Sequence, residues 1–136
     1  MKKCYPAKLE SIDSMSCDVE IFCAENNLDS SIQFAFTLSL DELITNTVNY
    51  GCANKKDVKI NLEMNIEDNV ICAILEDNAK LFDPTKDAVN PDISSDVESR
   101  KIGGLGIFFC KKNMDEFEYS SKNGMNTIIM KKYLSK

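Results

Sequence analysis

The stretch LDELITNTVNYG, which runs from Leu40 to Gly51, combines the pattern of a core-packed helix with polar side chains one turn apart. Its apolar residues recur at the spacing of an amphipathic helix that has one face on a core. Glu42 and Asn46 lie roughly 40° apart around such a helix, with Asn49 close to the same line. This polar stripe borders the apolar face. It is either a solvated helix edge or a set of ligands for a metal ion or a phosphate.

The composition indicates a globular protein of modest size. Hydrophobic residues make up 43% and charged residues 28% of the 136-residue chain, so we expect a single domain over residues 1–136. The net charge of −6 disfavours binding to nucleic acid or to an anionic membrane, because both would repel the chain. The sequence has no long apolar run and no signal-peptide pattern, so we expect a cytoplasmic location.

The six cysteines do not have the spacing of a metal site. There is no C-x-x-C pair, and the chain has no histidine to complete a zinc site. Most of the cysteines stand among apolar neighbours, so we expect buried, reduced thiols. The absence of histidine also excludes histidine-based acid/base chemistry on this chain.

Helical spacing predicts three helices. The first covers residues 11–27 and the last covers residues 102–114, where glycines open it. Between them, Asp29-Ser30-Ser31 supplies N-cap chemistry for a helix that continues through Tyr50. Gly51 is suited to end that helix as its C′ residue.

Alternating or continuous apolar residues predict five strands, over 3–9, 58–64, 70–75, 116–121 and 126–133. Asp68-Asn69 and Asn123-Gly124 are typical hairpin turns between neighbouring strands. We therefore expect an α/β (α+β) two-layer sandwich with a mixed β-sheet and helices on one face. The polar segment 83–101 is long and has no apolar periodicity, which predicts a functional lid.

Two further segments carry chemistry of the same kind as Glu42 and Asn46. In the first, EDNAKLFDP over residues 76–84, Asp77 follows a buried strand and is able to accept a hydrogen bond from an exocyclic amine, although an Asx turn also explains such a residue. In the second, Gly103-Gly104-Leu105-Gly106 opens a helix, where backbone N–H groups approach phosphate oxygens; it is otherwise a flexible turn.

Taken together and in this order, the segments resemble the anti-sigma factor serine kinases of bacterial partner-switching systems. These are single-domain members of the histidine-kinase-like (GHKL) ATPase superfamily, and the resemblance runs from the first helix to the last strand. It implies that Asn46 coordinates Mg²⁺ and that Glu42 is the general base. It also implies that Asp77 reads the adenine amino group. Phe82 matches the family's segment after that Asp. Gly104-Leu105-Gly106 matches the family's glycine box, which borders the ATP lid.

The resemblance implies a wider nucleotide site, in which Thr127 supports the adenine. The family usually has glycine where this chain has Ala79, so nucleotide affinity and base selectivity depend on whether that methyl group is accommodated. Arg100 either reaches the γ-phosphate or is a solvated charge of the lid. The implied nucleotide-binding residues are Asn46, Asn49, Asp77, Ala79, Phe82, Gly103, Gly104, Leu105, Gly106, Ile107 and Thr127.

The resemblance implies an ATP- and Mg²⁺-dependent serine protein kinase. Its partners would be a small STAS-like anti-sigma-factor antagonist, which it phosphorylates, and a sigma factor, which it sequesters; a homodimer is also implied. The alternative is a switch of the same fold that grips its partner without phosphorylating it. The catalytic module of a sensor histidine kinase fits poorly, because no phosphoacceptor histidine is present. A cysteine-based redox protein would need paired thiols.

Overall fold

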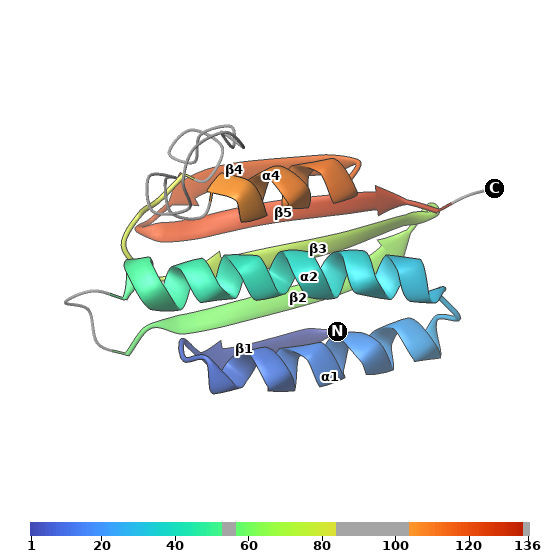
Figure 1. Ribbon diagram of the computed structural model, residues 1–136, viewed down its shortest axis with the longest axis horizontal. Coiled ribbons are helices and arrows are strands. Elements are labelled where there is room, and N and C mark those ends of the chain that lie inside the picture. Colours follow the sequence, from blue (N-terminus) through green and yellow to red (C-terminus); the bar gives the residue numbers. More distant parts are fainter. Residues whose placement is uncertain (53–56, 84–103, 135–136) are drawn as a thin grey trace.

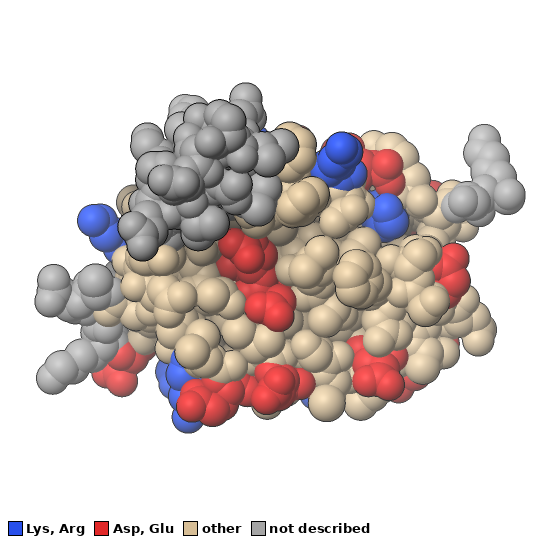
Figure 2. Space-filling model, viewed as in Figure 1, with Lys and Arg blue, Asp and Glu red and all other residues tan. Residues whose placement is uncertain are grey.

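The computed structural model describes residues 1–52, 57–83 and 104–134, in which helices lie on one face of a five-stranded sheet (Figure 1). In the described part of the chain, no helix is both long and apolar enough to cross a membrane. On the helix-covered face, acidic side chains are spread among uncharged ones (Figure 2). In chain order the elements are β1 (Lys2–Pro6), α1 (Glu10–Glu25), α2 (Ser30–Asn46), the π-helical turn η1 (Thr47–Gly51), β2 (Lys59–Glu67), β3 (Val70–Asp77), α4 (Gly104–Asn113), β4 (Glu116–Lys122) and β5 (Met125–Tyr133).

The sheet has the order β1-β2-β3-β5-β4, and each of its neighbouring pairs is antiparallel. The expectation of a mixed sheet was therefore wrong. Strands β3 and β4 run in the same direction, but β5 returns from the β4–β5 hairpin and lies between them. Because β5 lies between β3 and β4, all four pairs of neighbouring strands are antiparallel. The predicted two-layer arrangement with helices on one face of the sheet is confirmed.

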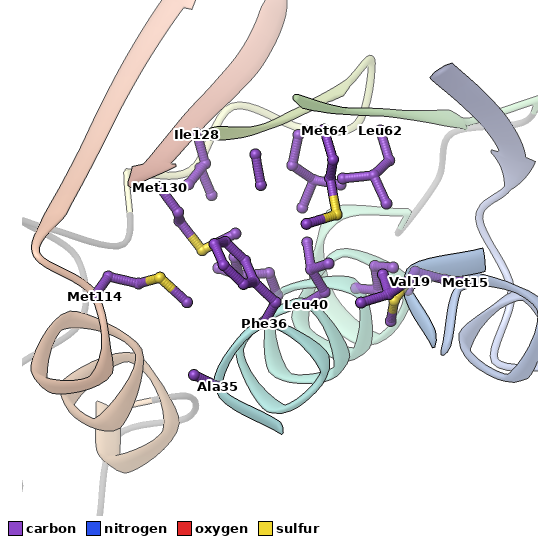
Figure 3. Packing of buried hydrophobic residues seen from close by; sticks show 14 of the residues in the cluster. Met15, Val19, Ala35, Phe36, Leu40, Leu62, Met64, Met114, Ile128 and Met130 are labelled. Carbon is purple, nitrogen blue, oxygen red and sulfur yellow. The ribbon is translucent and has the colours of Figure 1, made fainter. Parts of the chain in front are cut away.

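Alternating strand residues and the helices α1, α2 and α4 build the core. Phe36 and Leu40 of α2 point at the sheet, where they meet Leu62 and Met64 of β2 and Met130 of β5 (Figure 3). In β3 every second residue is buried, so the last of them, Asp77, shares the helix-facing side of the sheet with the core residues. A carboxylate is thereby brought to the edge of an apolar core.

Both predicted hairpin turns are confirmed. Asp68 and Asn69 have φ values of 52° and 61°, and Asn123 and Gly124 have φ values of 54° and 77°. Two successive residues with positive φ make a type I′ turn, whose twist matches that of the flanking antiparallel strands. The second turn fixes the register of β4 against β5, in which Ser121 lies opposite Asn126, and on its other side β5 places Asn126 opposite Asp77 of β3.

Helix α2 begins as predicted and ends differently. The Asp29 carboxylate accepts a hydrogen bond of 3.1 Å from the Ile32 N–H, which is an N-cap. The α-helix stops at Asn46, and the chain continues as the π-helical turn η1. Gly51 does not adopt the positive φ of a C′ terminator; it is buried, and its carbonyl accepts a 2.9 Å hydrogen bond from the Lys80 N–H. The end of η1 is thus tied to the segment that follows β3.

Gly51 also makes room for Ala79. A Cβ atom added to Gly51 would lie 3.0 Å from the Cβ atom of Ala79, closer than such atoms normally approach. Ala79 is 2% exposed and does not have a positive φ, so its methyl group causes no backbone strain. The methyl group that the resembling family usually lacks is therefore accommodated beside a glycine.

The cysteines are less buried than expected. Cys23 and Cys110 are buried, Cys52 and Cys72 are half-buried, and the thiols of Cys4 and Cys17 belong to exposed residues. All six are free thiols. Burial raises the pKa of Cys110 to about 11, so that thiol stays protonated and inert at neutral pH.

We predict that Gly51→Ala destabilises the protein because its new methyl group would collide with that of Ala79. Overpacking of this kind costs about 1–3 kcal/mol of unfolding free energy. Ala79→Gly in the same chain should remove most of that cost, which a double-mutant cycle in urea measures. An equal cost of Gly51→Ala in both backgrounds would contradict the contact.

Candidate functional site

A cavity of about 290 Å³ opens where α2 and η1 meet the chain segment after β3. Its walls are mainly apolar, with Leu43 from α2, Ile107 from α4 and Ile128 from β5, and a few polar groups converge on it. An apolar cleft of this size with convergent polar groups suits a planar ligand such as a nucleobase. The other lining residues are Asn46, Thr47, Tyr50, Gly51, Asp77, Ala79, Lys80, Leu81, Phe82 and Asn126.

Asp77 is the acidic group of the cavity and is only 5% exposed. Its Oδ1 atom accepts hydrogen bonds from the Ala79 N–H, at 3.0 Å, and from Nδ2 of Asn126, at 2.9 Å. The first of these is the Asx-turn bond that the sequence offered as an alternative explanation of Asp77. The Asx turn is therefore confirmed, and it fixes the carboxylate in the wall of the cavity, while its hydrogen bond to an exocyclic amine stays a prediction.

Asn126 holds the other side of this wall and was not predicted. Its Nδ2 atom donates to Asp77 and, at 3.0 Å, to the carbonyl oxygen of Lys80. Its Oδ1 atom accepts from the Phe82 N–H at 3.1 Å and from the Tyr119 hydroxyl at 2.5 Å. One buried amide thus joins β3, β4, β5 and the segment 80–82.

The structure does not bring Thr127 to the cavity. Thr127 pairs with Glu76, and both side chains lie on the sheet face opposite to Asp77, whereas Asn126 pairs with Asp77 itself. Because strand residues alternate between the faces, neighbours in sequence cannot share one. Ile128 and Met130 are buried and apolar, so they show which alternate residues of β5 face the helices. The same alternation assigns Asn126 to that face, and it can be read from the sequence alone.

Asn46, the last residue of α2, lines the cavity with a buried amide. Its Nδ2 atom has no hydrogen-bond partner among the described residues, which costs about 1–3 kcal/mol when no ligand satisfies it. Rotating the amide by half a turn would present its oxygen at the same place. The described residues contain no group of three or more Cys, Asp or Glu side chains that could hold a metal ion by themselves. A cation beside Asn46 would therefore need further ligands from a bound substrate or water.

Glu42 is half-buried one turn before Asn46 and is not among the lining residues of the cavity. Its carboxyl group packs against Gly106 in the first turn of α4, where a Cβ atom would overlap it. Burial, and then the negative charge of Asp41, raise the pKa of Glu42. A carboxylate with a raised pKa is suited to accept a proton.

The remaining predicted residues divide into three groups. Phe82, which is 38% exposed, lines the cavity with Ala79 and Ile107. Asn49 is exposed and does not line it, because η1 is a π-helical turn and shifts the residue off the α-helical line. Gly104 and Leu105 form the start of α4, whereas Gly103, Arg100 and nearly all of the predicted lid lie outside the described residues.

Comparison with known proteins identifies the family of this fold. The family model described as histidine kinase-like ATPase domain matches residues 5–132. The serine-protein kinase RsbW of Listeria monocytogenes is 30% identical over 101 residues, which are 72% of this chain and 64% of the relative. That of Staphylococcus aureus is 31% identical over 103 residues, with 73% and 64% coverage. The chain thus spans less than two thirds of the length of these relatives.

Two solved structures share the fold at low identity. The RsbU and RsbW domains of Rv1364c from Mycobacterium tuberculosis align at 13% identity with a TM-score of 0.67, over 100% of this chain and 33% of that one. The histidine kinase domain of the Erythrobacter litoralis EL346 blue-light activated histidine kinase aligns at 9% identity with a TM-score of 0.58, over 95% and 61%. Because the family model covers nearly the whole chain, this protein belongs to the histidine kinase-like ATPase domain family.

Proposed function

We propose that this chain is an ATP- and Mg²⁺-dependent serine protein kinase that acts as an anti-sigma factor. The observation that carries the proposal is one cavity in which a buried carboxylate, Asp77, and an unsatisfied amide, Asn46, stand in a mainly apolar wall. The general base, Glu42, lies one helical turn from Asn46 and against the start of α4. The relatives named serine-protein kinases support the same activity.

The adenine would bind between apolar residues, with its 6-amino group toward Asp77. Ionised carboxylates only accept hydrogen bonds, so Asp77 favours a ligand edge that donates. Ile107 and Phe82 offer apolar surface to the ring from α4 and from the segment after β3. Ala79 would be tolerated, because its methyl group packs against Gly51.

The triphosphate would extend toward Asn46 and the N-terminus of α4. An amide oxygen is a suitable hard ligand for Mg²⁺, so Asn46 would hold the ion together with phosphate oxygens and water. Mg²⁺, when bound, neutralises charge on the phosphates. The backbone N–H groups of Gly104, Leu105 and Gly106 stand in the first turn of α4, where a helix favours anions.

Glu42 would accept the proton of the attacking serine hydroxyl. In that step the hydroxyl oxygen of the partner forms a bond to the γ-phosphorus, and the bond from this phosphorus to the bridging oxygen of ADP breaks. The products are phosphoserine, ADP and a protonated Glu42, which returns its proton to water. The raised pKa of Glu42 suits this role because it strengthens the base.

The partners belong to the proposal as well. They are a small STAS-like antagonist that carries the serine and a sigma factor that the chain sequesters, in a homodimer in the cytoplasm. The supporting argument is the resemblance of the motifs around Glu42, Asp77 and Gly106 to anti-sigma factor kinases. Calorimetric titration with ATP and Mg²⁺, followed by phosphate transfer to candidate antagonists, tests the whole proposal.

We predict that Asp77→Asn weakens ATP binding at least tenfold, because an amide nitrogen would replace one acceptor oxygen in a buried, hydrogen-bonded pair. Asn46→Ala should weaken Mg²⁺–ATP binding more than binding of adenosine, which has no phosphates. Titration calorimetry measures both. Wild-type protein that does not bind ATP at millimolar concentration would refute the nucleotide site.

We predict that Glu42→Gln retains ATP affinity and slows phosphate transfer by about 10²–10⁴-fold, because the amide keeps the shape but cannot take the proton. The wild-type rate should fall as the pH drops through the raised pKa of Glu42, since only the ionised carboxylate is a base, and Glu42→Gln should remove that dependence. Transfer at the wild-type rate would exclude Glu42 as the base. If the wild type binds its partner and ATP but transfers nothing, the chain is a binding switch.

A further inference from the structure

The hydrogen-bond network around Asn126 extends beyond the cavity to the edge strand β4. Tyr119 of β4 is not among the residues that line the cavity, yet its hydroxyl donates to Oδ1 of Asn126. Nδ2 of the same amide donates to Asp77, which does line it. A chain of two hydrogen bonds therefore connects an edge-strand tyrosine to the carboxylate of the proposed adenine site.

We propose that Asn126 and Tyr119 are positioning residues that set base selectivity by fixing the orientation of the Asp77 carboxylate. This inference rests on the proposed adenine site and adds to it the residues that determine how strongly the 6-amino group is read. Neither residue was identified from sequence.

The first argument is that the amide of Asn126 has no hydrogen-bonding capacity left for a ligand. An asparagine side chain has two N–H donors and two acceptor lone pairs. Asp77 and the Lys80 carbonyl take the donors, and the Phe82 N–H and the Tyr119 hydroxyl take the lone pairs. A base in the cavity would therefore be read by Asp77, while Asn126 contributes orientation.

The second argument is that this arrangement permits one orientation of the amide only. A half-turn of the side chain would place the Asn126 oxygen against the Asp77 carboxylate and its NH₂ group against the Phe82 N–H. Tyr119 reinforces the present orientation from the other side. Burial, and then the negative charge of Asp83, raise the pKa of Tyr119, so its hydroxyl remains a donor at neutral pH.

The third argument is that the network also places the apolar part of the cavity wall. The Phe82 N–H and the Lys80 carbonyl both bond to Asn126, so the segment 80–82 and the Asp77 carboxylate are held by one group. Loss of the Tyr119 bond would loosen the amide and, through it, both parts of the adenine site. The effect should therefore fall on base recognition and not on the phosphates.

The test compares ATP with purine riboside triphosphate, which lacks only the 6-amino group, in titration calorimetry of the full chain with Mg²⁺. The ratio of the two affinities measures the hydrogen bond to Asp77, and we expect about tenfold or more in the wild type. Tyr119→Phe should reduce this ratio at least threefold, because ATP, which is read by Asp77 as well as by the apolar wall, should lose more affinity than the analogue. Tyr133→Phe is the matched control, because its hydroxyl bonds to Glu116 on the surface of the same hairpin.

A second variant separates positioning from general stability. Asn126→Asp removes both N–H donors and places a carboxylate beside Asp77, so the affinity ratio should approach one at pH 8. At pH 6 a proton shared by the two carboxylates would restore a donor, and the ratio should rise; the wild-type ratio should stay constant. Amide exchange of the Phe82 N–H without nucleotide should accelerate in both variants.

The possible outcomes are distinct. If the wild type does not discriminate between the two nucleotides, the proposed reading of adenine by Asp77 fails first. If the wild type discriminates and Tyr119→Phe keeps both the full ratio and slow Phe82 exchange, the positioning role is refuted while the nucleotide site stands. Equal loss of affinity for both nucleotides would mean that Tyr119 only stabilises the fold. Should Asn126→Asp not fold, the Tyr119 result alone decides.

Discussion

The buried pair of Asp77 and Asn126 is the interaction on which the rest of the site depends. A carboxylate that is 5% exposed loses most of its hydration, and this is costly unless hydrogen bonds replace it. Two N–H donors do so at one of its oxygens, from Ala79 and from Asn126. The pair exists only because the antiparallel register places the end of β3 opposite the start of β5. The antiparallel pairing of β3 and β5 therefore also determines which polar groups meet in the wall of the cavity.

The second constraint is the junction between η1 and the segment after β3. The Lys80 N–H donates to the Gly51 carbonyl, and Gly51 has no side chain to collide with Ala79. Asn46 lies immediately before η1, so this junction also sets the distance between the proposed metal ligand and the carboxylate that we propose to bind adenine. A change at Gly51 would thus alter two parts of the site without contacting a ligand.

Much of the fold follows from local chemistry that the sequence shows directly. The turn residues predict both hairpins, and Asp29 predicts the start of α2. The antiparallel sheet was missed because strand order depends on which hairpin inserts where, and local patterns do not encode that order. The π-helical end of α2 was missed because Tyr50 and Gly51 fit an ordinary helix end equally well.

Position in the cavity could be predicted where a motif names the residue type, and not where only the strand register decides. Asp77, Asn46 and Ile107 line the cavity as expected. Thr127 was chosen by its residue type, although the alternation of β5 residues between the two sheet faces places Asn126, and not Thr127, on the buried face. A side-chain amide that bonds to two other strands and a loop has no linear motif, because its partners lie far apart in the chain.

Gly106 shows why loss of function at a glycine has more than one explanation. The sequence suggests that this glycine lets the backbone approach a phosphate, and a helix N-terminus supports that role. The structure adds a second reason, since any Cβ atom at this position would overlap the Glu42 carboxyl group. A variant such as Gly106→Ala would displace the proposed base even if its backbone N–H still met the phosphate. Reduced transfer with intact ATP affinity would then point to Glu42, whereas a parallel loss of ATP affinity would point to the phosphate contact.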